Sequence, residues 1–137
     1  MQITRLNPDG LDRCAAFYDF LCDKRKRDNI EAELREDKRR MYVCAEEGEF
    51  LGGVSISRLD EESVYLSYLV VRADRRNQGI GTELIEFSLK QAKKEGYRRV
   101  VLQVDFQNID AMRLYLRLGF KDAKKGLLDR AEMYKDL

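Results

Sequence analysis

Apolar positions recur along this 137-residue chain with two different periods, and each period predicts a different kind of element. Alternation of apolar and polar residues is typical of strands, whereas recurrence every three to four residues indicates an amphipathic helix. Strands are predicted over residues 2–6, 41–46, 50–58, 63–71 and 97–105, and around residues 131–135. Helices are predicted over residues 11–22, from about residue 80 to a stop at Gly96, and from a cap at Asn108 to a stop at Gly119.

The order of these elements predicts the fold class. The strand, helix and strand over residues 63–105 are close enough in sequence to form a right-handed βαβ unit, whose two strands run parallel. A turn at residues 47–49 predicts an antiparallel hairpin between the two strands that flank it. We therefore expect an α/β protein with a mixed sheet and helices on both faces. A chain of this length without repeats or linkers predicts a single domain over residues 1–137.

The first forty residues have a less regular pattern. The letters NPDG at residues 7–10 are a turn signal. Phe17 and Phe20 fall beside the apolar stripe of the first helix, where they either widen a core stripe or line a ligand cleft. Residues 23–40 interleave charges of both signs, which predicts a solvated helix rather than a nucleic-acid-binding arm.

Charge and composition exclude several classes of protein. The chain has 26 basic and 25 acidic residues, so no overall charge attracts it to nucleic acid or to an anionic membrane. No apolar run approaches the ~20 residues of a membrane helix, and the first ten residues lack the apolar core of a signal peptide. The three cysteines, Cys14, Cys22 and Cys44, show no CxxC spacing. They favour a reducing, cytoplasmic setting in which the thiols are small core residues.

The chain contains no histidine. The usual Ser-His-Asp and Cys-His nucleophilic sites therefore cannot be built, and neither can a His-ligated zinc site. We predict no metal site. Any catalysis must depend on Tyr, Asp, Glu or Lys side chains, on backbone amides, on bound water or on groups of the ligand.

The letters RRNQGIGT at residues 75–82 stand between a strand and a helix. In that arrangement the unpaired backbone N–H groups and the helix dipole bind phosphate oxygens. Gly79 and Gly81 are expected to allow a positive φ and to let a phosphate approach main-chain nitrogen, and the two arginines add positive charge. A Walker loop needs Gly-Lys-Ser/Thr, and a dinucleotide fingerprint needs a small residue where Leu84 stands, so both alternatives fit badly.

Two motifs together resemble the GNAT superfamily of N-acetyltransferases. Arg76-x-x-Gly79-x-Gly81 is similar to the acyl-CoA-binding signature of that superfamily, Arg/Gln-x-x-Gly-x-Gly/Ala. The second signature, Asn-x-x-Ala-x-x-x-Tyr-x-x-x-Gly-Phe, is matched by Asn108, Ala111, Tyr115, Gly119 and Phe120. The resemblance covers the chain well from Met41 to the C-terminus, and it covers the first forty residues only in outline.

The resemblance implies a GNAT-like fold, mostly antiparallel, with one parallel pair that splays apart to admit the pantetheine arm. The open edges would be residues 69–71 and 101–103. Acetyl-CoA would be the cosubstrate, with its pyrophosphate on the amides of residues 78–82. The acceptor would be a primary amine of a small molecule, peptide or protein, which attacks the thioester directly. The resemblance leaves a homodimer open.

The resemblance also implies roles for individual residues. Tyr115 would be the catalytic acid that protonates the departing thiolate, and Asn108 would hydrogen-bond the cofactor arm. The implied cofactor-binding residues are Leu69, Val70, Val71, Arg76, Asn77, Gln78, Gly79, Ile80, Gly81, Thr82, Asn108, Ala111 and Tyr115. The residues by themselves also allow Tyr115 to be a core aromatic and Asn108 to be only a helix cap. Arg72 and Arg75 are either contacts to the CoA 3′-phosphate or ordinary surface charges.

The general base is not evident. Where many relatives have a glutamate, this chain has Tyr65 or Gln103. Ordered water or one of the acids Glu61, Glu62 and Asp105 would have to deprotonate the amine. The acceptor site is expected from the first two helices and the turn at residues 59–62, whose acidic residues hint at a cationic acceptor.

Two other functions stay open, the first of them because of the missing base. The first is a non-catalytic acyl-CoA-binding module that regulates a partner. The second is an unrelated binder of nucleotide phosphates.

Overall fold

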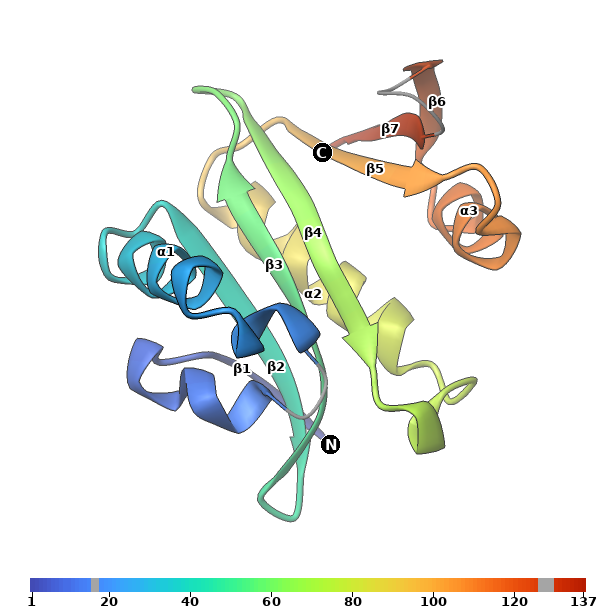
Figure 1. Cartoon of the computed structure of the whole chain (residues 1–137). Coiled ribbons are helices and arrows are strands. Elements are labelled where there is room, and N and C mark those ends of the chain that lie inside the picture. Colours follow the sequence, from blue (N-terminus) through green and yellow to red (C-terminus); the bar gives the residue numbers. More distant parts are fainter. Residues whose placement is uncertain (16–17, 126–129) are drawn as a thin grey trace.

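The computed structural model describes residues 1–15, 18–125 and 130–137. The strands of this described part form one seven-stranded sheet in the order β1-β2-β3-β4-β5-β7-β6 (Figure 1). Their bounds are β1 (Gln2–Arg5), β2 (Arg39–Glu46), β3 (Glu49–Arg58), β4 (Ser63–Val71), β5 (Arg99–Asp105), β6 (Lys121–Lys125) and β7 (Arg130–Asp136). β4 and β5 run parallel, and the other neighbouring pairs run antiparallel. The predicted mixed, mostly antiparallel sheet is confirmed.

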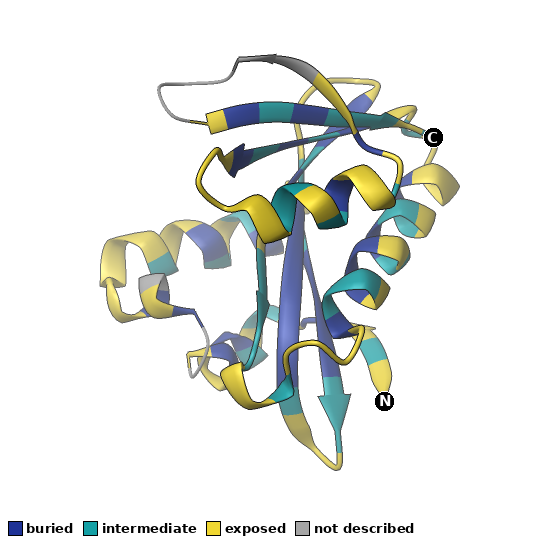
Figure 2. Cartoon of the chain, turned by 90° about the vertical axis from the view of Figure 1, so that its right-hand side faces the viewer, coloured by how far each residue is buried: buried dark blue, intermediate teal, exposed yellow. Residues whose placement is uncertain are grey.

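Helices cover both faces of the sheet, as predicted. On one face lie α1 (Lys24–Arg35) and the 3₁₀ helices η1 (Pro8–Cys14) and η2 (Asp19–Cys22). The opposite face packs against α2 (Ile80–Lys94) and α3 (Ile109–Arg117). In β2, Met41 and Val43 enter the core under α1, while Tyr42 and Cys44 enter the core under α2. This alternation is the period of two that the sequence shows. Figure 2 shows the buried positions along the strands and on the inner sides of the helices.

Local sequence signals explain the main turns. The β2–β3 hairpin turns through Glu47 and Gly48, with φ of 52° and 83°, which is the type I′ pattern of two positive φ values. α3 ends at Gly119, whose φ is 93°. There the Phe120 amide donates to the Tyr115 carbonyl (2.9 Å) and the Gly119 amide to the Leu116 carbonyl (3.0 Å), which is a Schellman motif. The predicted stop of this helix is confirmed.

The predicted α-helix over residues 11–22 is wrong. The described residues of this stretch form η1 and η2, with residues 16–17 outside the described part. Leu11 and Cys14 are both buried and three residues apart, which is the repeat of a 3₁₀ helix. The predicted NPDG turn opens η1, because the Asn7 side chain caps it and Pro8 occupies its first turn. Phe17 and the side chain of Phe20 lie outside what the structure describes.

Two further boundaries differ from the predictions. The charged helix ends at Arg35 instead of residue 40, because Asp37 adopts a left-handed φ of 60° and the Lys38 amide bonds back to the Glu33 carbonyl. Arg39 and Arg40 therefore belong to β2. β6 was not predicted, since its sequence, KDAKK, has no apolar alternation and it is a strand through its pairing with β7.

No helix in the described residues is long and apolar enough to cross a membrane. The same residues contain no group of three or more His, Cys, Asp or Glu side chains that could hold a metal ion.

Candidate active site

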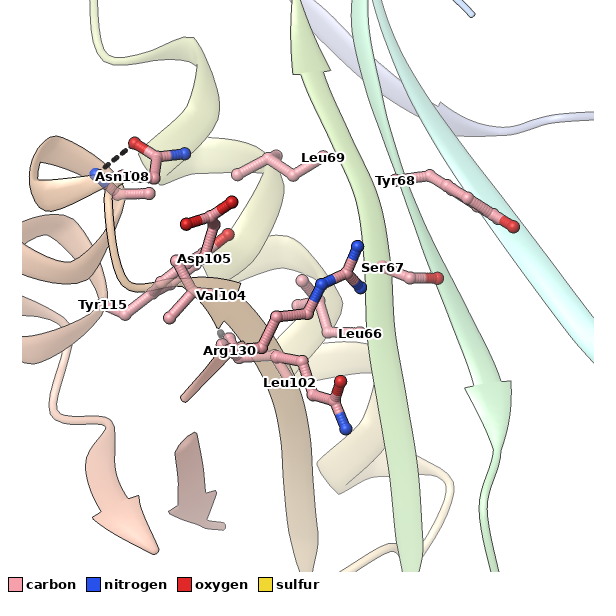
Figure 3. Close-up of a pocket in the computed structure, with 12 residues that line it drawn as sticks. Leu66, Ser67, Tyr68, Leu69, Leu102, Val104, Asp105, Asn108, Tyr115 and Arg130 are labelled. Carbon is pink, nitrogen blue, oxygen red and sulfur yellow. Dashed lines mark hydrogen bonds between the residues drawn. The ribbon is translucent and has the colours of Figure 1, made fainter. Parts of the chain in front are cut away.

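The candidate site is a gap between the two parallel strands. β4 and β5 pair only at Ser63–Arg99, Val64–Val100 and Tyr65–Val101. Beyond these residues the strands line a cavity of about 260 Å³ (Figure 3). Its lining residues are Leu66, Ser67, Tyr68, Leu69, Leu102, Gln103, Val104, Asp105, Asn108, Ala111, Tyr115 and Arg130. Of the implied open edges, residues 69–71 and 101–103, only Leu69, Leu102 and Gln103 line the gap. Val101 is still paired with β4, and Val70 and Val71 are not lining residues.

A β-bulge in β4 accompanies this opening. β3 and β4 pair at Gly53–Val70 and at Ser55–Ser67, so Tyr68 and Leu69 together face the single residue Val54. Tyr68 adopts a φ of 53°, and its carbonyl oxygen accepts a 2.6 Å hydrogen bond from the Tyr18 hydroxyl. Bulges bend and twist the strand that contains them. The bulge therefore changes the course of β4 in the segment that lines the gap.

The loop before α2 presents free backbone donors. Asn77 and Gly79 have φ of 62° and 82°, so the positive φ expected at Gly79 is found. The expectation for Gly81 is wrong, because Gly81 lies in the first turn of α2, with Asn77 as the other left-handed residue. No acceptor among the described residues takes a hydrogen bond from the amides of residues 77–82. These amides are the unpaired donors that suit phosphate oxygens.

The arginines near this loop are not equivalent. Arg75 pairs with Glu46 (2.7 Å) and contacts Gln78, and Arg72 pairs with Asp74 (2.7 Å) and Glu49 (3.3 Å). Arg76 is exposed, and its Nε donates to the Val71 carbonyl at 3.3 Å. Within the described chain, Arg76 is thus the loop arginine whose charge no carboxylate neutralises.

Tyr115 reaches the gap from α3. Its side chain is 8% exposed and its ring packs edge-on against Phe120 at 5.7 Å. Burial raises the pKa of Tyr115 to about 12, and the neighbouring Tyr65 adds to the rise. The phenol therefore keeps its proton at neutral pH and can act as a donor.

Asn108 and Ala111 line the gap beside Tyr115. The Asn108 side-chain oxygen accepts from the Ala111 amide at 3.2 Å and so caps α3. Figure 3 shows the amide nitrogen of Asn108 on the side that faces Leu69. That nitrogen makes no hydrogen bond to any described residue. One side chain can therefore cap the helix and still offer a donor to the gap.

The residues considered as the general base differ in whether they line the gap. Asp105 lines the gap, and one of its carboxylate oxygens accepts from the Gln107 amide at 2.8 Å. Glu61 and Glu62 precede β4 at its paired end, where the Glu62 carbonyl accepts from the Arg98 amide. The turn at residues 59–62 does not line the gap, and its place at the acceptor site and the hint of a cationic acceptor stay predictions. Burial raises the pKa of Tyr65, and Gln103 lines the gap.

No cysteine lines the gap. Cys14 is fully buried, and burial raises its pKa to about 11. Burial likewise raises the pKa of Cys44, and Cys22 is exposed away from the gap lining. A thiolate nucleophile is thus not available at this site within the described part of the chain.

The structure brings together part of the predicted set. Leu69, Asn108, Ala111 and Tyr115 line the gap, whereas the predicted residues 76–82 form the loop and first turn at the N-terminus of α2. The side chains of Val70, Val71 and Ile80 pack in or against the two cores. Their implied cofactor contacts stay predictions.

Sequence reasoning missed several lining residues, among them Ser67, Tyr68 and Arg130. A strand pattern could have indicated Ser67 as a neighbour of buried Leu66. The bulge at Tyr68 and the approach of Arg130 from β7 have no signal in the local sequence.

A loop of free amides before a helix, a splayed parallel pair and a buried phenol define an acyl-CoA acyltransferase type of fold. Residues 11–120 match the model of the Acetyltransferase (GNAT) family, and the chain belongs to this family.

Sequence similarity to known N-acetyltransferases agrees with this family membership. The chain is 36% identical over 103 residues to the uncharacterized N-acetyltransferase MJ1207 of Methanocaldococcus jannaschii, covering 69% of this chain and 46% of that protein. It is 32% identical over 83 residues to N-alpha-acetyltransferase 30 of Schizosaccharomyces pombe, covering 58% of this chain and 55% of that protein. The chain thus spans about half the length of these curated relatives.

The fold also matches a solved structure. The PaiA N-acetyltransferase of Thermoplasma acidophilum, crystallised with coenzyme A, superposes with a TM-score of 0.82. The sequences are 18% identical, and the match covers 100% of each chain. At this identity the likeness shows the fold alone.

Proposed function

We propose that this protein is an N-acetyltransferase that transfers the acetyl group of acetyl-CoA to a primary amine by direct attack. The observation that supports this most strongly is the pairing of free amides at residues 77–82 with a gap that contains Tyr115. The family match, the N-acetyltransferase relatives and the CoA-bound neighbour support the same assignment. A cytoplasmic setting and a homodimer stay predictions.

The residues of the chain fit acetyl-CoA along its length. The free amides and Arg76 would hold the pyrophosphate at the N-terminus of α2. A Cβ at Gly81 would meet only Val71, at an ordinary 3.8 Å, so the missing side chain leaves open space over these amides. Asn108 would donate its side-chain N–H to the pantetheine arm, and half-buried Ala111 leaves room for that arm beside α3.

Proton transfers in this proposal depend on two groups. Tyr115 would donate its proton to the departing sulfur. Its raised pKa keeps the proton in place, and it also makes Tyr115 a weaker acid than a thiol of pKa ~8.5, so donation has to accompany C–S bond cleavage. Either Asp105 or ordered water in the gap would remove the proton from the attacking amine. No cysteine is among the described residues that line the gap, and the chain has no histidine, so the amine would attack the thioester itself.

The test is acetyl-CoA turnover by purified protein with a panel of primary amines, followed as release of free CoA thiol. Wild-type protein should release CoA only when an amine is present, and Tyr115→Phe should be strongly impaired. Tyr97→Phe is a matched control, because Tyr97 follows α2 and does not line the gap. Turnover that is absent with every amine would exclude the proposal.

A second candidate is a non-catalytic acyl-CoA-binding module. It is favoured by the shortage of free carboxylates at the gap. Asp105 is the only carboxylate among the described lining residues, and one of its oxygens already accepts a hydrogen bond from the Gln107 amide. This candidate predicts CoA binding by calorimetry without turnover, and equal CoA affinity for wild type and Tyr115→Phe. A third reading, as a nucleotide-phosphate binder, predicts thermal stabilisation by ATP or NAD and none by CoA.

A further inference from the structure

Among the described residues, no helix covers β5 and β7 on the face of the sheet that α1 covers elsewhere. Figure 1 shows α1 over β2 and β3. On that side the core under α1 reaches β4 at Val70, and Tyr18 bonds to the Tyr68 carbonyl, whereas none of the described residues of that core comes from β5 or β7. Leu66, Leu102 and Met133 point to the core under α2 and α3. Their neighbours along each strand must therefore point to the opposite face. The polar ones among these neighbours are Tyr65, Ser67, Gln103 and Glu132. Ser67 and Gln103 line the gap, and so does Arg130.

Arg130 extends across the gap. It lies opposite Asp105 in the β5–β7 pairing, is exposed, and lines the gap. Figure 3 shows its side chain running toward Ser67 of β4, with the guanidinium between the separated strands. The same view shows the carboxylate of Asp105 turned away from that guanidinium. Burial raises the pKa of Tyr65 while the charge of Arg130 opposes the rise, which agrees with a guanidinium close to that phenol.

The other arginines of this face already have partners. Arg39 is bonded to Glu33 at 2.8 Å and to Ser55 at 2.7 Å, and only 12% of its side chain is exposed. Arg99 pairs with Asp136 at 2.8 Å and lies over the Tyr134 ring.

Arg130 differs from both. Among the ion pairs and hydrogen bonds between described residues, none includes Arg130, and none joins it to Glu132 two residues along β7. Arg130 therefore presents guanidinium donors to the gap.

We infer that Arg130 selects acceptors in which a carboxylate lies within a few bonds of the reacting amine. This inference rests on the proposed function. A guanidinium forms paired, planar hydrogen bonds with a carboxylate, and this geometry gives it selectivity for that group. The phosphates of acetyl-CoA would be held at the N-terminus of α2, so an anion at Arg130 has to come from the acceptor. Because Arg130 and Tyr115 line one cavity of about 260 Å³, the two acceptor groups have to be close together.

Two kinds of molecule have this chemistry. A free amino acid offers its own α-carboxylate, and a peptide with an acidic first residue offers a side-chain carboxylate. Matched pairs separate them: a free amino acid against its amide, and a peptide that begins with Asp against the same peptide that begins with Asn. In at least one pair, kcat/KM of the wild type should favour the carboxylate by about tenfold or more, mainly through the acceptor KM, because a paired carboxylate and guanidinium bind more strongly than neutral groups do.

Substitutions of Arg130 test whether this residue causes the preference for carboxylate acceptors. Arg130→Gln should bring the ratio within each pair close to one, and Arg130→Glu should favour the neutral member. The KM for acetyl-CoA should stay within about twofold of wild type in both variants, because phosphate binding at the loop is unchanged. Arg58→Gln is the control, since Arg58 is an exposed arginine at the end of β3 outside the gap, and it should keep the wild-type ratio.

The inference is overturned if the wild type prefers neither carboxylate, or if Arg130→Gln keeps the preference. Calorimetric binding of the same acceptors to protein saturated with CoA gives a readout without turnover. If no amine is acetylated but carboxylate acceptors bind in an Arg130-dependent way, the proposed function fails and the inference on Arg130 stands. If they neither react nor bind with that dependence, the inference fails as well.

Discussion

The hydroxyl of Tyr18 donates a 2.6 Å hydrogen bond to the backbone carbonyl of Tyr68, fifty residues later in the chain. The two rings also meet edge-on at 6.4 Å. Arg39 also contacts the bulge, because its guanidinium lies 5.2 Å from the centroid of the Tyr68 ring and donates to the Ser67 hydroxyl at 3.3 Å. The N-terminal segment, which precedes both sequence motifs, is therefore bonded to the bulge beside the candidate active-site gap.

Removing this bond should affect both stability and catalysis. Tyr18 is 3% exposed, so we expect Tyr18→Phe to lower the free energy of unfolding by about 1 kcal/mol, the net contribution of a typical hydrogen bond. A looser bulge should lower kcat, while the affinity for CoA should fall less, because the amides of residues 77–82 that would hold the pyrophosphate lie outside the bulge. Urea denaturation, steady-state kinetics and calorimetry measure the three quantities. Tyr42→Phe is the control, a buried tyrosine of the opposite core. A loss of stability with unchanged kcat would limit the bond to a structural role.

The proton of Tyr115 should matter for the chemical step alone. We expect Tyr115→Phe to lower kcat by about 100-fold or more, the usual contribution of a general acid, with the KM for acetyl-CoA close to wild type. The pKa of Tyr115 is raised to about 12, so its acid form is lost only as the pH rises through that value. The pH profile of kcat should therefore show no fall from Tyr115 below about pH 11. A fall near pH 10 that disappears in Tyr115→Phe would contradict the raised pKa.

The two loop glycines should respond differently to alanine. Gly79 has a φ of 82°, so Gly79→Ala should cost about 1–2 kcal/mol of stability and weaken CoA binding, although its Cβ would meet no atom within 4 Å. Gly81 is helical, so Gly81→Ala should leave stability unchanged or raise it by up to about 1 kcal/mol. The GNAT signature allows Ala at this position, so CoA binding should be retained. Thermal unfolding and calorimetry would show the contrast, and equal losses in both variants would refute it.

The capping and binding roles of Asn108 can be separated. Asn108→Ala removes the acceptor for the Ala111 amide and should cost about 1 kcal/mol of stability. Asn108→Asp keeps an acceptor and should keep that stability. If the side-chain nitrogen of Asn108 also serves the cofactor, Asn108→Asp should bind CoA more weakly than wild type. An aspartate variant with wild-type stability and wild-type CoA affinity would leave Asn108 as a cap only.

Much of the fold could be predicted because its signals are local. The alternation in β2, β3 and β4, the I′ turn at Glu47 and Gly48, and the cap and stop of α3 depend on residues that are neighbours in sequence. The helix predicted over residues 11–22 was wrong because a local pattern did not distinguish two kinds of helix. The spacing of Leu11 and Cys14 suits both an α-helix and a 3₁₀ helix, and tertiary burial decides between them.

The sequence by itself determined the loop of residues 75–82, the motif from Asn108 to Phe120 and the order of elements that brings them near one another. Only the tertiary structure decided where β4 leaves β5, which acids reach the gap, and that Arg130 enters it from β7. The physical reason is that periodicity, capping and turn chemistry act over a few residues. A bulge held by Tyr18, or a cation placed across two separated strands, depends on contacts between residues far apart in the chain.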